Sequence, residues 1–107
     1  MDQPQALSPR QTLQKLLENL LGSENVYFQP PASFRMRYPC IIYSRDRINS
    51  TFADNTTYNS RARYQVTYVD QNPDSDIPNK IAALPLCTHS NFFTADNLNH
   101  DVFTLFF

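Results

Sequence analysis

The sequence contains a single glycine, Gly22, and this scarcity excludes one large class of binding site. Loops that cradle phosphate groups depend on several glycines, because only a residue without a side chain lets the backbone approach the ligand closely. No serine or cysteine stands on a glycine-bounded turn from strand to helix, so the sequence shows no nucleophile of the hydrolase type. Eight prolines against one glycine favour stiff loops.

Net charge and long apolar runs are also scarce. The formal charge is -1, so the chain as a whole has no field that would attract nucleic acid or an anionic membrane. The N-terminus has neither a positive region nor an apolar stretch of the signal-peptide type, and no run approaches the roughly 18 apolar residues of a membrane span. We therefore expect a soluble protein, made in a cytoplasm, without a membrane partner.

Cysteine is rare as well. Cys40 and Cys87 are too few for a disulfide-stapled secreted domain, and both fall within strand-like runs. We expect two buried, reduced thiols that are not joined to each other.

A zinc site is the one metal centre that the residue types allow. It would combine Cys87, His89 and His100 with Asp96 or Asp101. None of the recognised zinc-ligand spacings is present, so the sequence predicts no metal and no other cofactor.

A chain of 107 residues, 41% of them hydrophobic, is long enough to bury a core as one domain. Residues 1–7 are polar and contain a proline, so we assign them to a flexible N-terminal arm. Residues 8–107 form the single domain.

The strongest helix signal covers residues 9–21. Ser8 is placed to cap the helix, and Pro9 occupies the first helical position. Gln11 can close a capping box, and Gly22 stands where a left-handed C-terminal cap is needed. The apolar stripe of the helix consists of Leu13, Leu16, Leu17, Leu20 and Leu21.

The rest of the chain is organised around two long strand-like runs, residues 38–46 and 61–70. In the second run Tyr64, Val66 and Tyr68 fall on one face and alternate with polar residues. We expect the two runs to pair as an antiparallel hairpin whose apolar face the leucine stripe covers. An aromatic sheet could instead stack RNA bases, but this face is needed to pack the helix.

Shorter elements complete the predicted fold. Residues 26–28 predict a short strand at a sheet edge, and Ser75 or Asp76 can cap a short second helix. Residues 86–94 and 101–107 predict a second hairpin, joined by residues 95–99. The expected fold class is α+β: a mainly antiparallel sheet built from a long central hairpin and a C-terminal hairpin, packed by an N-terminal amphipathic helix and a short second helix.

Four arginines flank the loop between the central strands. All stand at odd positions, so an antiparallel hairpin would gather them on one face. Guanidinium groups bind phosphate and carboxylate bidentately, which makes the cluster a candidate contact with DNA or with an acidic protein neighbour. The alternative is a solvated face that Asp46 and Asp54 partly neutralise. The four residues are Arg45, Arg47, Arg61 and Arg63.

The loop itself, residues 47–60, is a second candidate for partner contact. It holds the isolated aromatic residues Phe52 and Tyr58, and loops of this length are often binding loops.

The last strand offers a third candidate contact. If Phe103, Leu105 and Phe107 face the core, alternation puts Val102 and Phe106 on the opposite face. A subunit contact would then cover these two side chains.

Six short pieces of the chain stand in an order that resembles one protein family. They are NVYFQPP at 25–31, YPCIIY at 38–43, FADN at 52–55, RYQVT at 63–67, DQNPDS at 70–75 and TADNLNHDVF at 94–103. As an ordered set they are similar to the small tail terminator, or tail completion, proteins of long-tailed bacteriophages.

This resemblance implies a structural virion protein and not an enzyme. The expected subunit forms a ring, typically a hexamer, on the head-proximal end of the finished tail tube, where it ends tail polymerisation and presents the docking face for the neck. The implied partners are further copies of the chain, the tail tube protein and a head-completion or neck protein, with DNA in the channel as a passive contact.

Two alternatives stay open. The first is another neck component, such as a head-completion stopper, or a tail tube protein. The second is a small metal-dependent or acid/base enzyme.

Overall fold

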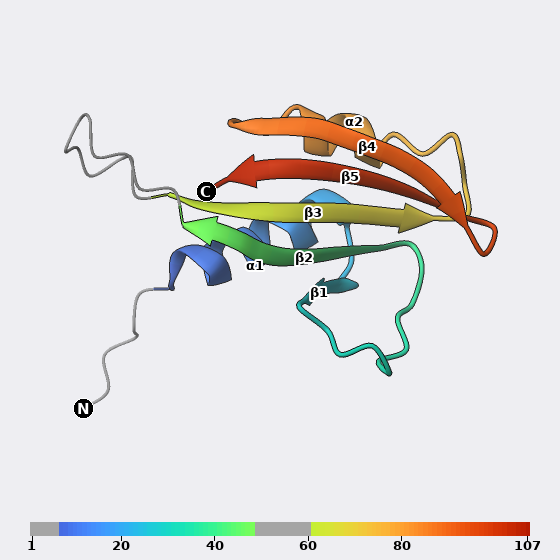
Figure 1. The fold of residues 1–107 in the computed structure, drawn as a ribbon, viewed down its shortest axis with the longest axis horizontal. Helices are drawn as coiled ribbons and strands as arrows, with labels where there is room; N and C mark the ends of the chain where they lie inside the picture. The colour runs from blue at the N-terminus through green and yellow to red at the C-terminus, as the bar shows by residue number, and fades with distance from the viewer. Residues whose placement is uncertain (1–6, 49–60) are drawn as a thin grey trace.

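The computed structural model describes residues 7–48 and 61–107 (Figure 1). The elements are α1 (Pro9–Leu21), β1 (Val26–Phe28), β2 (Cys40–Ile48), β3 (Ala62–Asp70), α2 (Ile77–Ala82), β4 (Cys87–Ala95) and β5 (Leu98–Phe106). The strands form one sheet in the order β1-β2-β3-β5-β4, in which β1 and β2 run parallel and the other neighbours antiparallel. The predicted fold class, α+β with a mainly antiparallel sheet, is confirmed.

The start and the end of α1 are set by the residues that the sequence predicts. Ser8 Oγ accepts a hydrogen bond from Gln11 N–H at 3.1 Å, and Gln11 Oε1 accepts one from Ser8 N–H at 2.9 Å. This capping box precedes a helix with Pro9 in its first turn. Gly22 ends the helix with φ 81° and ψ 18°, and its N–H donates to the Glu18 carbonyl at 2.8 Å.

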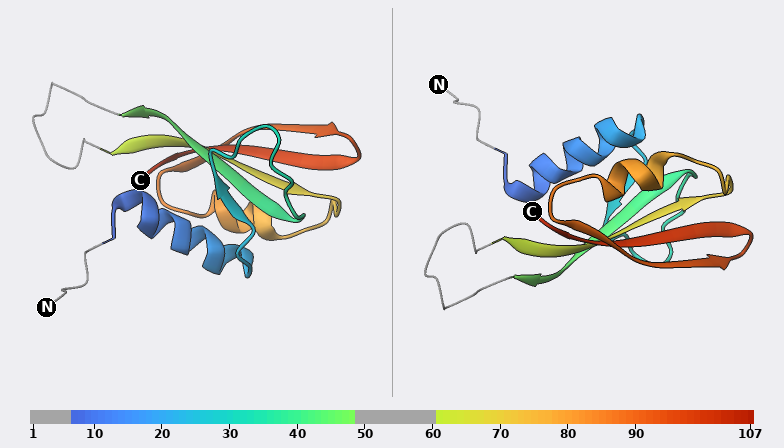
Figure 2. Two further views of the ribbon diagram at one scale, coloured as in Figure 1. Left: turned by 90° about the horizontal axis from the view of Figure 1, so that it is seen from below. Right: turned by 90° about the horizontal axis from the view of Figure 1, so that it is seen from above.

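Both helices lie on one face of the sheet, which we call the helix-covered face (Figure 2). Leu13 and Leu17 of α1 and Ile81 of α2 are fully buried against it. Fully burying a side chain of this size stabilises a fold by about 1.5 to 3 kcal/mol. The alternation of the strands gathers their large apolar side chains on one face, and the helices therefore cover that face. The sheet contributes Val26, Ile41, Tyr43, Tyr64, Val66, Tyr68, Phe103 and Leu105 to this core.

A polar network fixes α1 against β1 and β2. Gln14 Oε1 accepts a hydrogen bond from the Tyr43 hydroxyl at 2.6 Å, and Gln14 Nε2 donates to the Val26 carbonyl oxygen at 2.9 Å. The same Nε2 donates to the Glu18 carboxylate at 2.9 Å, and Arg10 donates to the Tyr43 hydroxyl at 3.4 Å. Burial raises the pKa of Tyr43, so its hydroxyl stays protonated and available as a donor.

The opposite side of the sheet, which we call the open face, carries no helix. The left view of Figure 2 shows the connection from β1 to β2 arching over part of it. Cys40 and Val69 form a register pair and are 0% and 1% exposed. Cross-strand partners share a face, and Ile41 on the covered face is the chain neighbour of Cys40, so the pair lies on the open face. Part of this face is therefore buried as well.

The boundaries of the central strands and of α2 differ from the prediction. β2 begins at Cys40 and continues to Ile48, so the predicted loop begins two residues too early, at 47. Asp76 stands at the cap of α2 without a side-chain cap bond, whereas Ser75 Oγ accepts from Ile77 N–H at 3.2 Å.

The turn between β4 and β5 is tighter than predicted. Residues 95–99 do not form a five-residue loop, because Ala95 already pairs with Leu98. Asp96 and Asn97 alone turn the chain, with φ of 55° and 63°. Two consecutive residues with positive φ are typical of hairpin turns whose twist matches that of the flanking strands.

Both cysteines are free, as predicted. Cys40 is buried, but Cys87 is only half-buried because it lies on the edge strand β4. Burial raises the pKa of both thiols, that of Cys40 to about 12.

Several predicted features lie outside the described residues. These are residues 1–6 of the N-terminal arm, the loop residues Phe52 and Tyr58, and Asp54. Among the helices in the described ranges, none is long and apolar enough to cross a membrane.

Candidate interaction surfaces

The predicted arginine cluster is divided between the two faces of the sheet. Arg45 pairs with Tyr64, whose side chain is in the core, and Arg47 pairs with Arg63. The register shifts between these pairs, which makes Asp46 the extra residue of a β-bulge. Cross-strand partners share a face, so Arg45 belongs to the helix-covered face and Arg63 to the open face. The expectation of one shared face is wrong, because the bulge resets the alternation.

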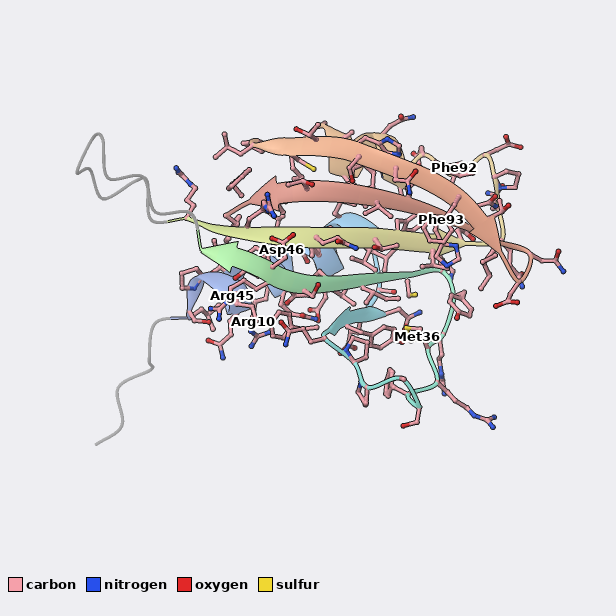
Figure 3. All side chains as sticks on the ribbon, in the orientation of Figure 1. Arg10, Met36, Arg45, Asp46, Phe92 and Phe93 are labelled. Atoms are coloured by element: carbon pink, nitrogen blue, oxygen red, sulfur yellow. The ribbon has the colours of Figure 1, made fainter. Side chains whose placement is uncertain are left out.

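Arg63 is engaged within the chain. Its Nε donates to Asp46 Oδ1 at 2.8 Å, and the two side chains are 30% and 36% exposed. This bears out the expected partial neutralisation by Asp46. Arg61 is exposed just before β3, and the backbone N–H of Arg45 donates to the Gln29 side chain at 3.3 Å. Figure 3 labels Arg45 and Asp46 near the end of β2.

Val102 and Phe106 lie on the open face. Phe103 and Leu105, which alternate with them, are 0% and 1% exposed in the core, and Phe106 pairs in register with Arg63. The predicted alternation is confirmed. Both Val102 and Phe106 are half-buried within the single chain.

The residues of the alternative zinc set are not brought to one place. His89 Nε2 lies 3.0 Å from Asp101 Oδ1. His100 precedes Asp101 in β5 and therefore points to the other face, where its ring stacks on Phe93 with centroids 4.5 Å apart. Asp96 lies in the tight turn. Within residues 7–48 and 61–107, no three metal-binding side chains form a group.

The sequence analysis did not identify the most exposed apolar surface, which lies on β4. In the part of the chain that the structure describes, β4 pairs with β5 alone, so alternate residues direct N–H and C=O groups away from the sheet. Eight of its nine residues are exposed, and none is Asp, Glu, Lys, Arg or Pro. The exposed fractions of Leu86, Phe92 and Phe93 are 55%, 52% and 43%. Charges, prolines and β-bulges usually protect such edges. β4 has a bulge between His89 and Asn91 but neither charged residues nor prolines.

Leu86, just before β4, has a strained backbone. Its φ is 59°, in the left-handed region that costs an L-residue about 1 to 2 kcal/mol. Its carbonyl accepts from Phe106 N–H at 3.1 Å, which holds it in this conformation. More than half of the side chain is exposed, so core burial does not offset the strain. A strained, exposed leucine supports the hypothesis that β4 meets a partner.

A second exposed surface lies in the connection from β1 to β2. Phe34 and Tyr38 are 43% and 42% exposed, and the exposed Arg35 and Arg37 alternate with Met36 between them. We call Phe34, Arg35, Arg37 and Tyr38 the basic loop. Figure 3 labels Met36 in this loop, and Phe92 and Phe93 at the far edge of the sheet.

The basic loop is held in one conformation. The rings of Tyr27 and Phe34 pack edge-on with centroids 5.0 Å apart. The Tyr27 hydroxyl accepts from Arg37 N–H at 3.3 Å, and Phe34 N–H donates to the Pro31 carbonyl at 3.0 Å. A loop that is ordered before binding loses less conformational entropy when it binds.

Charge is distributed unevenly between the two edges of the sheet. Residues 25–48, which include β1, the basic loop and β2, contain four arginines against one carboxylate. Residues 70–107, which include β4 and β5, contain five aspartates against one lysine and two histidines. The net charge of -1 therefore conceals a basic side and an acidic side. A charge count by region would have shown this from the sequence.

No protein-family model matches the chain, and no curated protein or solved structure is significantly similar to it.

Proposed function

We propose that the chain is a structural subunit of a bacteriophage virion. Several copies, six by analogy with the family that the sequence resembles, form a ring on the head-proximal end of the tail tube. The ring ends tail polymerisation and presents the docking face for the neck. The proposed partners are other copies of the chain, the tail tube protein and a head-completion protein, and the ring acts by shape and contact, without catalysis.

The observation that carries this proposal is the exposed edge of β4. A monomer leaves eight exposed strand residues and three large apolar side chains in water, which is a hazard for uncontrolled pairing. About half of each side chain, Leu86, Phe92 and Phe93, remains to be covered. Covering half of a large apolar side chain contributes about 1 kcal/mol, so the three contribute about 3 kcal/mol per contact before the costs of association.

The segments that carry the resemblance support the same proposal. Pieces 25–31 and 38–43 adjoin the basic loop on either side, and piece 94–103 contains the turn between β4 and β5. The α+β fold class also agrees with the fold that the resemblance implies. We propose the open face, which includes Arg63, as the side that contacts the tube or the neck.

Electron microscopy and light scattering of the purified chain test the proposal. We expect closed rings of one size. Open stacks of indefinite length would favour a tail tube protein instead, and a chain that stays monomeric at high concentration would refute the ring.

A variant of the β4 edge makes the test specific. Phe92→Asp places a charge on the exposed edge and should leave a folded chain that no longer forms rings. Assembly would have to bury the new carboxylate, and removing a charge from water costs free energy. The matched control is Asn19→Asp, an exposed position on α1, which lies on the helix-covered face. Rings of normal size from the Phe92→Asp chain would show that β4 is not the contact.

A further inference from the structure

We infer that the acidic end of β4 in one copy binds the basic loop of the next copy, in a head-to-tail contact. This rests on the proposed function, because it names the two surfaces that would close the proposed ring. The surface at the end of β4, which we call the acidic edge, consists of Phe92, Phe93, Asp74 and Asp96. Phe92 and Phe93 are successive residues of the strand, so their rings point to opposite faces of the sheet at this edge.

The positions of the two surfaces suit a ring. β4 is the last strand at one edge of the sheet, and the basic loop adjoins β1 at the other edge (Figure 1). In a closed ring of more than two copies, each subunit uses two different surfaces, and one surface of each copy contacts the other surface of the next copy. Pairing of β4 with β4 would be two-fold symmetric and would end at a dimer.

The backbone of β1 offers few free groups for strand addition by β4. Val26 N–H donates to the Glu24 carbonyl at 2.8 Å, and the Val26 carbonyl accepts from Gln14 at 2.9 Å. β1 is also only three residues long. We therefore place the contact at this edge on the side chains of the basic loop.

The acidic edge includes two exposed carboxylates on segments that adjoin the β4–β5 hairpin. Asp96 follows β4 directly, and Asp74 lies in the segment after β3. The Asn99 side-chain amide donates to the carbonyl oxygens of Asp70 and Gln71, at 3.2 and 3.3 Å, and so ties this segment to the β4–β5 hairpin. Both carboxylates are exposed, and neither forms an ion pair with a residue that the structure describes.

The two surfaces are complementary in charge and in apolar character. Arg35 and Arg37 are exposed and have no carboxylate partner within the described ranges. Two guanidinium groups can therefore bind the two carboxylates, each bidentately. Exposed aromatic rings on both surfaces add apolar contact area, and the charges beside them set orientation and association rate.

Charge exchange between the surfaces tests this contact. One variant, Arg35→Glu/Arg37→Glu, makes the loop acidic. The other, Asp74→Arg/Asp96→Asn, makes the edge basic, and asparagine is used at 96 because it tolerates the φ of 55° there. Each variant alone should dissociate at least about tenfold more readily than the unmodified chain, because like charges then face each other.

An equal mixture of the two variants is expected to assemble again. The acidic edge of the first meets the basic loop of the second, and the basic edge of the second meets the acidic loop of the first, so the copies alternate around the ring. Sedimentation velocity measures the assembly, and circular dichroism checks that each variant is folded. Lys15→Glu, an exposed charge reversal on α1, controls for net charge and should assemble normally.

The outcomes separate the inference from the proposed function. Rings from the unmodified chain, with both variants assembling equally well, would overturn the edge-to-loop contact and leave the ring standing. Failure of the mixture to assemble would also overturn the contact. A monomeric unmodified chain would overturn the ring and the contact together.

Discussion

Replacing Gln14 by alanine is expected to loosen α1 from the sheet without removing a buried apolar side chain. The Gln14 side chain bonds to the Tyr43 hydroxyl, the Val26 carbonyl and the Glu18 carboxylate. In the variant the Tyr43 hydroxyl, on a side chain that is 1% exposed, has lost its acceptor and keeps only the bond that Arg10 donates. The Val26 carbonyl has lost its side-chain donor.

The expected loss follows from these two groups. A buried polar group left without a partner costs about 1 to 3 kcal/mol. The Val26 carbonyl belongs to the edge strand β1 and its bond to Gln14 is only partly buried, so it takes the low end of this range, and the two groups together cost about 2 to 3 kcal/mol. Alanine returns about 0.4 kcal/mol of helix propensity. The net loss is about 2 kcal/mol, which corresponds to a fall in Tm of about 10 °C for a chain of this length.

Urea and thermal unfolding, followed by circular dichroism on samples that sedimentation shows to be monomeric, measure this loss. Asn19→Ala, at an exposed position of the same helix, is the control and should change the free energy of unfolding by less than about 0.5 kcal/mol. Gln14→Met keeps the length of the side chain and isolates the hydrogen bonds. A Gln14→Ala chain as stable as the control would show that the network does not hold α1.

Three further predictions concern the cap, pH and the bulge. Gly22→Ala should lower the free energy of unfolding by about 1 kcal/mol. The loss comes from backbone strain alone, since φ is 81° and an added Cβ would meet no atom within 4 Å. An unchanged Tm would contradict this. Burial raises the pKa of Cys40 from 9.0 to about 12, and burial with the Asp70 hydrogen bond raises that of Tyr68 from 10.0 to about 12. The folded chain thus holds protons that the unfolded chain releases. The contribution of these two groups to the free energy of unfolding is fully present below about pH 9 and is lost between about pH 9 and 12. Equal urea midpoints at about pH 8 and about pH 10.5 would contradict this prediction. Asp46→Ala breaks a partly exposed ion pair with Arg63 and should cost less than about 1 kcal/mol in urea unfolding, whereas a loss above about 2 kcal/mol would mean that the pair organises the bulge.

The parts of the fold that depend on local chemistry could be predicted from the sequence. The limits of α1 follow from residues within one turn of each end, Ser8, Gln11 and Gly22, and all three act as expected. The face that Tyr64 and Tyr68 share follows from simple alternation within one strand. In each case the cause and its effect lie a few residues apart.

The faces of the arginines could not be predicted, because they depend on a bulge. Alternation holds from Cys40 to Arg45, and the extra residue at Asp46 then reverses it. No glycine or other conspicuous residue marks the position in the sequence. The tight turn, by contrast, had a usable signal, since Asp96-Asn97 are the residues that most readily adopt positive φ after glycine.

The position of β4 at the sheet edge could not be predicted either. Strand order is a non-local property, and here the last strand, β5, inserts between β3 and β4. The run Cys87–Ala95 is consistent with either a covered strand or an edge strand until that order is known. This is why the sequence analysis placed the subunit contact on Val102 and Phe106 and not on Phe92 and Phe93.

The stability of the monomer does not explain the composition of β4. Exposed positions tolerate lysine or glutamate, and a charge there would protect the edge, yet β4 has no Asp, Glu, Lys or Arg. Leu86 adds backbone strain and an exposed apolar side chain at the same edge, and folding of the single chain benefits from neither. In the proposed ring, another copy would cover this edge. Burial would then offset the strain, and the exposed backbone groups would gain partners. Among the described residues, the basic loop is constrained by its own contacts and opposite in charge, and it is the surface that we propose to supply those contacts.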